Sequence, residues 1–326
     1  MKAIAQQRYG SADVLSLQDV EPPTVGPDEV LVHVHAAGVD PGVWICMTGR
    51  PYLARLAFGL RRPKVAVRGR DVAGVVSAVG ERVSQFRPGD EVYGTSLRGS
   101  YAEFAVAPAE RLAHKPATIS FAQAAAVPVS GQTALAAVRA GEVTEGQRVM
   151  VIGAGGGVGA YLVQLVKARG AHVTAVCSTA KIDLVRSLGA DDAVDYTVDG
   201  LGTGIRKYDV IIDTGGDRRL SVLRRMLTPR GTLVLVGGGY DQSRILGGYS
   251  RQLLRAPLLS LFIGQRLRGV TARERTADLD ELRELIESGK LTPVVERTYP
   301  LATAPDAIRR LTTARPAGKL VVTVRA

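Results

Sequence analysis

The chain has 326 residues, 46% of them hydrophobic and 22% charged, and a formal net charge of +11. This composition is that of a soluble globular protein, and the length predicts two domains. Two cysteines, Cys46 and Cys177, are too few for a disulfide framework or a four-cysteine zinc site, and they indicate a reducing, cytoplasmic location. Because neither an apolar run of membrane-spanning length nor a signal-peptide core occurs, neither secretion nor a membrane partner is expected.

The surplus of basic residues could serve an anionic partner, whether nucleic acid, acidic lipid or a phosphorylated ligand. Nucleic-acid arms usually carry their bases in dense blocks with aromatic residues between them. In this chain the bases are mostly spread along periodic segments, which argues against nucleic acid as a partner.

The first 115 residues have the pattern of short strands and turns. Alternating apolar residues predict strands over 30–36, 72–79 and 101–107, and Gly26–Asp28 and Pro88–Asp90 predict turns. This region is therefore expected to be mainly β, with few helical stretches.

From about residue 120 the pattern changes to strands that alternate with helices. The strands are unbroken apolar runs, at 149–152, 173–176, 210–212 and 233–236. Such an alternation is typical of βαβ units around a parallel sheet that is covered on both faces. The tail then predicts two amphipathic helices and a last strand, over 278–288, 304–313 and 320–324.

A glycine-rich segment directly follows the strand over 149–152 and opens a helix over 160–169. A glycine-rich turn at this place lets backbone N–H groups approach a pyrophosphate at the positive end of the helix. The strict G-x-G-x-x-G pattern would need glycine at Val158, and the spacing that fits is instead every third residue. We interpret the segment as a dinucleotide-binding turn with Gly153, Gly156, Gly157, Val158 and Gly159.

The end of the next strand indicates which dinucleotide is bound. NAD enzymes place an acidic residue there, which accepts a hydrogen bond from the ribose 2′-hydroxyl. In this chain the strand ends without a carboxylate, and Ser178, Thr179 and Lys181 offer donors to a 2′-phosphate. NADPH (NADP+) is therefore favoured over NADH, although Lys181 could simply be solvated and Asp183 could still influence the ribose.

Several stretches, in order along the chain, match the motifs of one family. Besides the glycine-rich segment they are Ala36–Pro41, Gly69–Gly74, Phe86–Gly94, Val127–Leu135, Ser187–Asp191 with Asp195 and Tyr196, Tyr208–Asp213, and Gly318–Lys319. On these residues the chain resembles the medium-chain dehydrogenase/reductase superfamily over essentially its whole length, and within it the zinc-free quinone oxidoreductase branch.

The resemblance implies an α/β protein with a discontinuous architecture. A GroES-like β-rich catalytic domain would comprise residues 1–120 and 258–326, and a Rossmann-fold domain with a doubly wound parallel sheet, residues 121–257, would bind NADP. The active site would lie in the cleft between them. Because relatives commonly self-associate, a homodimer is expected.

The resemblance also bears on zinc. Zinc-dependent members carry a cysteine ligand, a Gly-His-Glu and a further cysteine at positions that correspond here to Asp40, Arg70 and Ala126. An arginine is never a zinc ligand, because it cannot be deprotonated in proteins. The resemblance therefore implies a zinc-independent member without a metal site.

Without a metal to polarise an alcohol, the accessible chemistry is reduction of an activated acceptor such as a quinone or an enone. The resemblance places Tyr52 over the nicotinamide, where a phenol can donate to the developing oxyanion or protonate the α-carbon; aromatic packing is the alternative. Asp40 stands where relatives usually have Asn, and Val43 where many have Asp. Asp40 is therefore expected to form hydrogen bonds close to the cofactor.

Further cofactor contacts follow from the same resemblance. A purely structural role is the alternative for each except Thr133 and Gly237, and at Gly237 a close approach of the backbone is a physical reason for glycine. Thr133 would touch the nicotinamide ring or its ribose, and Tyr196 would lie near the 2′-phosphate. The nicotinamide half would be lined by Asp213 with Thr214 and by Val236, Gly237 and Gly238, and Lys319 would close on the cofactor from the tail.

Two stretches combine many bases with few acids. Residues 55–70 contain six bases and no acid, and residues 244–273 contain six arginines around the apolar run 258–263. Both would border the cleft in the resembled fold, where a basic rim could attract NADPH and an anionic substrate. Solvated surface is the alternative, and the apolar run could equally be a dimer contact.

The leading hypothesis is an NADPH-dependent, zinc-independent oxidoreductase that transfers hydride to quinones or α,β-unsaturated carbonyls. One alternative is an NADP(H)-dependent alcohol dehydrogenase or carbonyl reductase. Another is an NADPH-binding regulatory protein with low turnover, which the altered residues Asp40 and Val43 motivate.

Overall fold

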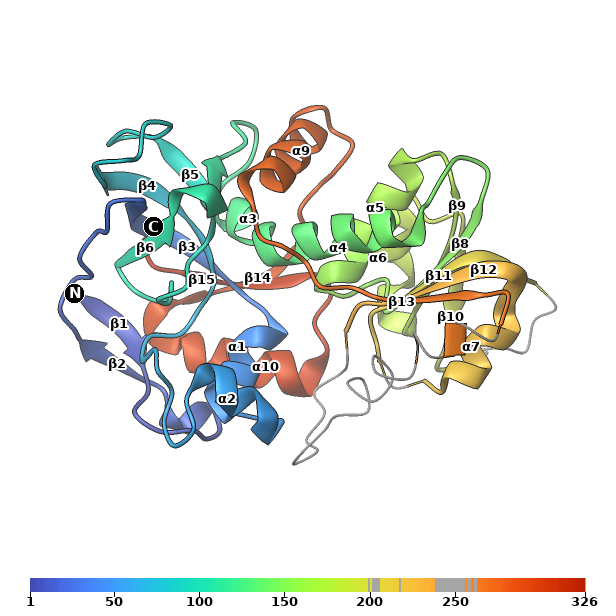
Figure 1. Ribbon diagram of the computed structural model, residues 1–326, viewed down its shortest axis with the longest axis horizontal. Coiled ribbons are helices and arrows are strands. Elements are labelled where there is room, and N and C mark those ends of the chain that lie inside the picture. The colour runs from blue at the N-terminus through green and yellow to red at the C-terminus, as the bar shows by residue number, and fades with distance from the viewer. Residues whose placement is uncertain are drawn as a thin grey trace. The chain divides into compact units, whose positions relative to one another are not determined.

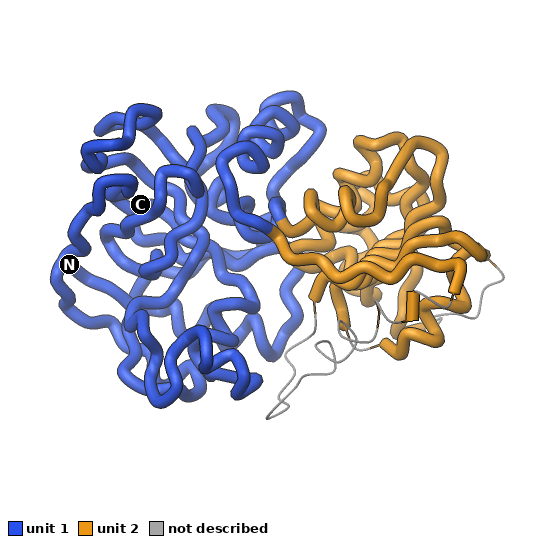
Figure 2. The backbone as a smooth tube through the Cα atoms, in the orientation of Figure 1, with its two compact units in different colours: residues 1–132, 273–326 blue, residues 133–272 orange. Residues whose placement is uncertain are grey.

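The chain divides into two units, which Figure 2 shows in different colours. Unit 1 comprises residues 1–132 and 273–326, and unit 2 comprises residues 133–272. The computed structural model describes residues 1–198, 200, 206–216, 218–237, 256, 259–260 and 263–325. None of the helices in these ranges is long and apolar enough to cross a membrane.

Unit 1 is built on a seven-stranded sheet. Six of its strands follow the order β14-β15-β3-β4-β5-β7, and the seventh, β6, pairs with β3. The last strand of the chain pairs antiparallel with β3, so that Leu320 lies opposite Val39. This pairing joins the N-terminal and the C-terminal segments of unit 1 in one sheet (Figure 1). The strands are β3 (Glu29–Val39), β4 (Asp71–Val79), β5 (Glu91–Thr95), β6 (Phe104–Pro108), β7 (Leu112–His114), β14 (Val295–Pro300) and β15 (Lys319–Thr323), with β1 (Lys2–Ala5) and β2 (Ser16–Asp19) as a separate pair.

Alternation along these strands produces the core of unit 1. Val30, Val32 and Val34 of β3 are buried and pack with Val72 and Val76 of β4, as the period of two in the sequence predicts. The helices of this unit are α1 (Pro41–Thr48), α2 (Arg55–Phe58), α3 (Phe121–Ala125), α9 (Thr276–Glu287) and α10 (Ala304–Ala314), with the 3-10 turns η1 (Ala12–Val14), η2 (Tyr52–Ala54), η3 (Ala109–Arg111) and η5 (Leu301–Thr303).

Helix α1 is not predicted by the apolar pattern, but the residues at both of its ends are typical of helix ends. Asp40 is the N-cap, and its side chain accepts a hydrogen bond from the Gly42 N–H at 2.7 Å. Pro41 occupies the first turn, and Gly49 ends the helix in the left-handed region with φ +59°. Asp-Pro at the start and Gly at the end are standard helix signals.

Unit 2 is built on a six-stranded parallel sheet with the order β10-β9-β8-β11-β12-β13. Numbered from β8, this is 3-2-1-4-5-6, the strand order of dinucleotide-binding doubly wound folds. The elements are α4 (Pro128–Gly141, which begins in unit 1), β8 (Arg148–Ile152), α5 (Gly157–Ala168), β9 (His172–Cys177), η4 (Thr179–Lys181), α6 (Ile182–Ser187), β10 (Asp192–Asp195), β11 (Tyr208–Asp213), α7 (Leu220–Met226), β12 (Leu227–Leu235) and β13 (Arg266–Gly269). The parallel α/β class predicted from the sequence is confirmed.

The unit boundaries fall later in the chain than the predicted ranges 1–120, 121–257 and 258–326. Residues 121–132 belong to unit 1 because their polar groups bond within it: the Val129 N–H donates to Asp71, and Gln132 accepts from the Arg275 N–H. Residues up to 272 belong to unit 2, in which β13 pairs with β12.

Candidate functional site

The glycine-rich turn of unit 2 is shaped by backbone approaches that leave no room for side chains. Gly153 follows β8 with φ +78°, and a Cβ there would lie 2.3 Å from the Thr214 hydroxyl oxygen. A Cβ on Gly159 would lie 2.1 Å from the carbonyl oxygen of Gly153. Real Cβ atoms do not approach this closely, so the chain itself demands glycine at both positions.

The turn presents an open helix N-terminus at the switch point of the sheet. Gly156 is the N-cap of α5, and no side chain caps this helix. The first N–H groups of a helix have no intrahelical acceptor, and the helix dipole favours an anion there. The turn follows β8 and touches Thr214 after β11, the two strands between which the strand order reverses. Gly157, Val158 and Gly159 thus supply N–H groups suited to a pyrophosphate.

The sequence predicts no carboxylate at the end of β9, and the structure differs in this respect. Register places Asp195, at the end of β10, opposite Cys177, so a carboxylate does lie beside this strand end. Thr179 donates its hydroxyl to Asp195, and hydrogen bonds from Thr179 and Thr197 lower the pKa of Asp195. Thr179 is therefore already engaged. The sequence analysis named Asp195 only within a matching stretch and missed its place beside the end of β9, because the carboxylate comes from the neighbouring strand.

Lys181 lies at the glycine-rich turn, and its contact with the nucleotide stays a prediction. A Cβ on Gly155 would lie 2.6 Å from Lys181 Cδ, so the lysine stem covers this part of the turn. Ser178, the N-cap of η4, makes no capping hydrogen bond with its side chain.

Some of the residues expected to line the nicotinamide half of the site form hydrogen bonds within unit 2 that shape its turns. Asp213 is buried, and its Oδ1 accepts from the N–H groups of Gly215 and Gly216 at 2.9 and 3.4 Å, which shapes the turn after β11. Val236 follows β12 and donates its N–H to the Asp213 carbonyl. A Cβ on Gly237 would lie 3.6 Å from the Thr214 carbonyl oxygen, an ordinary distance, so no contact within the chain demands this glycine.

Two more expected residues can be placed, and a third lies outside the described residues. Tyr196 follows β10, and the guanidinium of Arg218 lies 5.7 Å from its ring centroid. The sequence analysis missed Arg218, a cation beside a residue expected near the 2′-phosphate. Thr133 lies within α4 and is half-buried. Gly238 and the arginines between 244 and 255 are outside the described residues.

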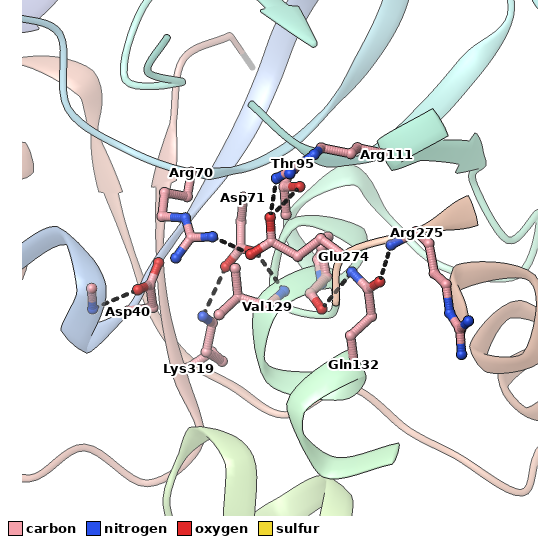
Figure 3. Close-up of polar contacts among 12 residues, drawn as sticks. Asp40, Arg70, Asp71, Thr95, Arg111, Val129, Gln132, Glu274, Arg275 and Lys319 are labelled. Atoms are coloured by element: carbon pink, nitrogen blue, oxygen red, sulfur yellow. Dashed lines mark hydrogen bonds and ion pairs between the residues drawn. The ribbon is translucent and has the colours of Figure 1, made fainter. Parts of the chain in front are cut away.

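Unit 1 contains a polar cluster, which Figure 3 shows, at the ends of β3, β4 and β15. Glu274 is its centre, with 10% of its side chain exposed. Its carboxylate accepts from Arg70, from Arg111 at 2.7 Å and from the Thr95 hydroxyl at 3.0 Å. These donors come from three separate segments, so Glu274 ties them together.

A second ion pair of the cluster is fully buried. Lys319 Nζ donates to Asp71 Oδ2 at 2.9 Å, and the Val129 N–H donates to Asp71 Oδ1 at 2.7 Å. The two side chains are 3% and 0% exposed. Burial raises the pKa of Asp71 to about 6, although the Lys319 charge lowers it. The ammonium of Lys319 is thus engaged inside unit 1, and its contact with a cofactor stays a prediction.

The positions compared with zinc ligands converge in this cluster. A Cβ on Gly38 would lie 2.4 Å from both Asp71 Oδ2 and the Ala125 carbonyl oxygen, which brings the segments of Asp40, Arg70 and Ala126 together. Asp40 is buried and caps α1 with Oδ1, while its Oδ2 has no hydrogen-bond partner. Among the described residues no group of three or more His, Cys, Asp or Glu side chains could hold a metal ion.

Arg70 carries a permanent positive charge at this place. Burial lowers its pKa, but the negative charges of Asp40, Glu274 and Asp71 outweigh burial and raise it. Its side chain is 35% exposed, so the surrounding acids enclose Arg70 only in part. The sequence analysis treated Arg70 only as a zinc-ligand replacement and a rim charge; Glu274, some 200 residues away, gave no sequence signal.

Tyr52 has a different environment from the polar cluster. It begins η2 and is 41% exposed, and the guanidinium of Arg55 lies 4.7 Å from its ring centroid. The ring is therefore neither a core residue nor a member of the Glu274 network. Its role over the nicotinamide stays a prediction.

Comparisons with known proteins agree with this architecture. Residues 26–117 match the alcohol dehydrogenase GroES-like domain, and residues 188–322 match the zinc-binding dehydrogenase model. The chain is 33% identical to the mitochondrial NAD(P)H oxidoreductase RTN4IP1 of Mus musculus, over 99% of this chain and 89% of that protein. It is 34% identical to the chloroplastic NADPH-dependent alkenal/one oxidoreductase of Arabidopsis thaliana, over 99% and 79% of the two chains.

A solved structure extends the likeness to three dimensions. The quinone oxidoreductase from Coxiella burnetii is 29% identical and superposes with a TM-score of 0.86, over 100% of this chain and 99% of that one. The predicted GroES-like and Rossmann-like domains are thus confirmed, and the relatives support a nicotinamide nucleotide as cofactor. The chain belongs to the medium-chain dehydrogenase/reductase superfamily, in its quinone oxidoreductase-like branch, and is an oxidoreductase.

Proposed function

We propose that the protein is an NADPH-dependent reductase of quinones or α,β-unsaturated carbonyls that works without zinc. The proposal that no zinc is used depends on the residue types at the three positions where zinc-dependent members have their metal ligands. They contain a helix-capping Asp40, an ion-paired Arg70 and Ala126, which has no donor side chain. A guanidinium cannot ligate zinc, so this set does not fit the metal.

The residues of unit 2 fit a dinucleotide. Gly153, Gly156 and Gly159 leave the backbone bare at the uncapped end of α5, where a pyrophosphate would be held. Lys181 is a cation beside this turn, and Arg218 is a cation beside Tyr196. Both charges favour binding of the additional phosphate of NADPH. When bound, NADPH supplies the hydride for the reduction.

In unit 1, Arg70 is suited to hold the acceptor. Reduction of an enone or a quinone develops negative charge on the carbonyl oxygen, and a fixed cation at that oxygen stabilises the transition state. The acids around Arg70 hold its guanidinium in place before an acceptor binds. The unpartnered Oδ2 of Asp40 could accept a hydrogen bond beside it. Tyr52 is the candidate proton donor, with water as the alternative.

The direct test is oxidation of NADPH, followed by its absorbance, with a quinone, an enone, a saturated ketone and an aldehyde as acceptors. We expect turnover with the first two, tighter binding of NADPH than of NADH, and no effect of a metal chelator. Preference for the saturated carbonyls would favour the alcohol dehydrogenase alternative, and no turnover on the whole panel would favour a regulatory protein. An unchanged rate in Tyr52→Phe would remove Tyr52 from the mechanism.

Arg70→Met is expected to lower kcat/KM for the acceptor by about 10- to 100-fold, because the cation at the carbonyl oxygen is lost. Arg70→Lys should recover part of this loss. Arg111→Met is the matched control, since Arg111 bonds to the same Glu274 carboxylate. If both methionine variants lose activity equally, Arg70 acts only through the stability of the cluster.

The expected homodimer and the expected cytoplasmic location stay predictions. The relative from Mus musculus is named as mitochondrial and that from Arabidopsis thaliana as chloroplastic. Gel filtration with light scattering would decide the first, and fractionation of the source cells the second.

A further inference from the structure

Large apolar side chains are exposed in one short segment of unit 1. The described residues contain eight exposed large apolar side chains, and five of them lie in nine consecutive residues: Tyr52, Leu53, Leu56, Phe58 and Leu60. Leu56 and Leu60 are 68% and 67% exposed. Single exposed apolar residues are ordinary, but a contiguous group marks a place of interaction.

The same segment is basic. Arg61, Arg62 and Lys64 are exposed directly after the apolar residues, and no acid occurs between residues 50 and 64. We call residues 52–64 the basic apolar loop. The two basic residues of the stretch 55–70 that follow it, Arg68 and Arg70, are buried and half-buried instead, so the exposed charge of this stretch is concentrated in the loop.

The base of the loop is held firmly to the rest of unit 1. The Tyr9 hydroxyl donates to the Gly59 carbonyl at 2.5 Å, and Arg55 Nε donates to the Gly49 carbonyl at 3.1 Å. The Arg55 guanidinium also lies 4.4 Å from the Tyr9 ring centroid. Gly59 adopts φ +118°, and a Cβ there would lie 2.1 Å from the Arg62 carbonyl oxygen, so this turn requires glycine. The hydrogen bonds of Tyr9 and Arg55 thus tie the segment that carries the apolar side chains to the rest of unit 1.

We propose that the basic apolar loop docks the protein on the surface of a membrane that contains anionic lipids. Apolar side chains beside a group of bases are the combination that binds the interface of such a bilayer, the first by shallow burial and the second by attraction to the headgroups. The net charge of +11 acts in the same direction.

A second copy of the chain is the other candidate occupant, and charge argues against it. A symmetric contact through this loop would bring the same three exposed bases of both copies together. The loop holds no acid to pair with them, and like charges across an interface are unfavourable. A lipid surface of opposite charge has no such conflict.

The proposal revises one expectation from the sequence. The lack of a spanning segment argued against a membrane partner, but docking at the surface needs none. The inference does not rest on the proposed reductase activity, because membrane binding is measured without cofactor or acceptor.

The test is co-sedimentation of the full-length chain with vesicles of phosphatidylcholine, with and without phosphatidylglycerol. We expect binding to the anionic vesicles at least about 100-fold tighter than to the neutral ones, and weakened by salt. The charge variant Arg61→Gln/Arg62→Gln/Lys64→Gln should lose on the order of 100-fold in affinity. The apolar variant Leu56→Ser/Leu60→Ser should lose about tenfold or more.

The matched control is Leu17→Ser/Leu97→Ser, which removes two exposed leucines of the same unit outside the loop. It should bind vesicles like the original chain, and circular dichroism should show all variants folded. The proposal is wrong if the original chain does not bind anionic vesicles, or if the control loses as much as the apolar variant. It is also wrong if sedimentation velocity shows a dimer that the apolar variant converts to monomer while vesicle binding is unchanged.

Discussion

Lys319→Met is expected to lower the free energy of unfolding by about 3–5 kcal/mol, because it leaves a buried carboxylate without its counter-charge. Asp71 is fully buried, and Lys319 is its ion-pair partner, 248 positions away in the sequence. The Val129 N–H remains as a donor, but one neutral hydrogen bond does not offset the burial of a charge. Urea unfolding followed by circular dichroism measures the loss.

The pH dependence of the stability loss in Lys319→Met tests whether the unpaired charge of Asp71 causes that loss. The pKa of Asp71 is already raised to about 6, above the ordinary value near 4, so in the original chain this group's contribution to stability falls as pH rises from about 4 to about 6. Without Lys319, which lowers this pKa, the pKa should rise further. The variant's deficit should therefore be large at about pH 8 and shrink as the pH falls and the carboxyl becomes neutral.

Two variants complete this experiment. Lys290→Met removes an exposed lysine and should change the free energy of unfolding by no more than about 0.5 kcal/mol. Asp71→Asn/Lys319→Met removes both charges and should recover much of the lost stability at about pH 8. A deficit in Lys319→Met no larger than that in Lys290→Met would contradict the role assigned to the pair.

The two units differ in how much of them the sequence predicts. In unit 2 the four inner strands, β8, β9, β11 and β12, contain the predicted apolar runs, so the parallel sheet and the glycine-rich turn follow from local patterns. The two edge strands, β10 and β13, were not predicted, because neither is an unbroken apolar run. In β13, Arg266 and Arg268 alternate with Leu267, and the domain boundary predicted from the sequence falls before this strand.

In unit 1 the sequence predicted strands β3, β4, β6 and β15, but it did not predict the polar cluster. Glu274 and Lys319 meet Arg70 and Asp71 only because the tail returns to the first sheet, and no local pattern encodes a pairing over 200 residues. The resemblance to a family located the segments of Asp40 and Arg70. It did not indicate which acids hold the arginine.

Gly153→Ala is expected to weaken NADPH binding by about 100-fold or more. The added methyl group would lie 2.3 Å from the Thr214 hydroxyl oxygen, and the residue has φ +78°, which L side chains rarely adopt. The turn must therefore move, and a displacement of about 1 Å in a positioned site can cost on the order of 100-fold. Titration of cofactor fluorescence measures the affinity, and thermal unfolding checks that the variant is folded.

Gly146→Ala is the matched control for this prediction, because it separates strain in the backbone from damage to the nucleotide site. Gly146 belongs to the same unit and has φ +76°, but no atom lies within 4 Å of its added Cβ. It should cost about 1–2 kcal/mol of stability and leave NADPH affinity unchanged. If Gly153→Ala folds and binds NADPH as tightly as Gly146→Ala, the pyrophosphate is not held at this turn, because a site built on these N–H groups cannot tolerate their displacement.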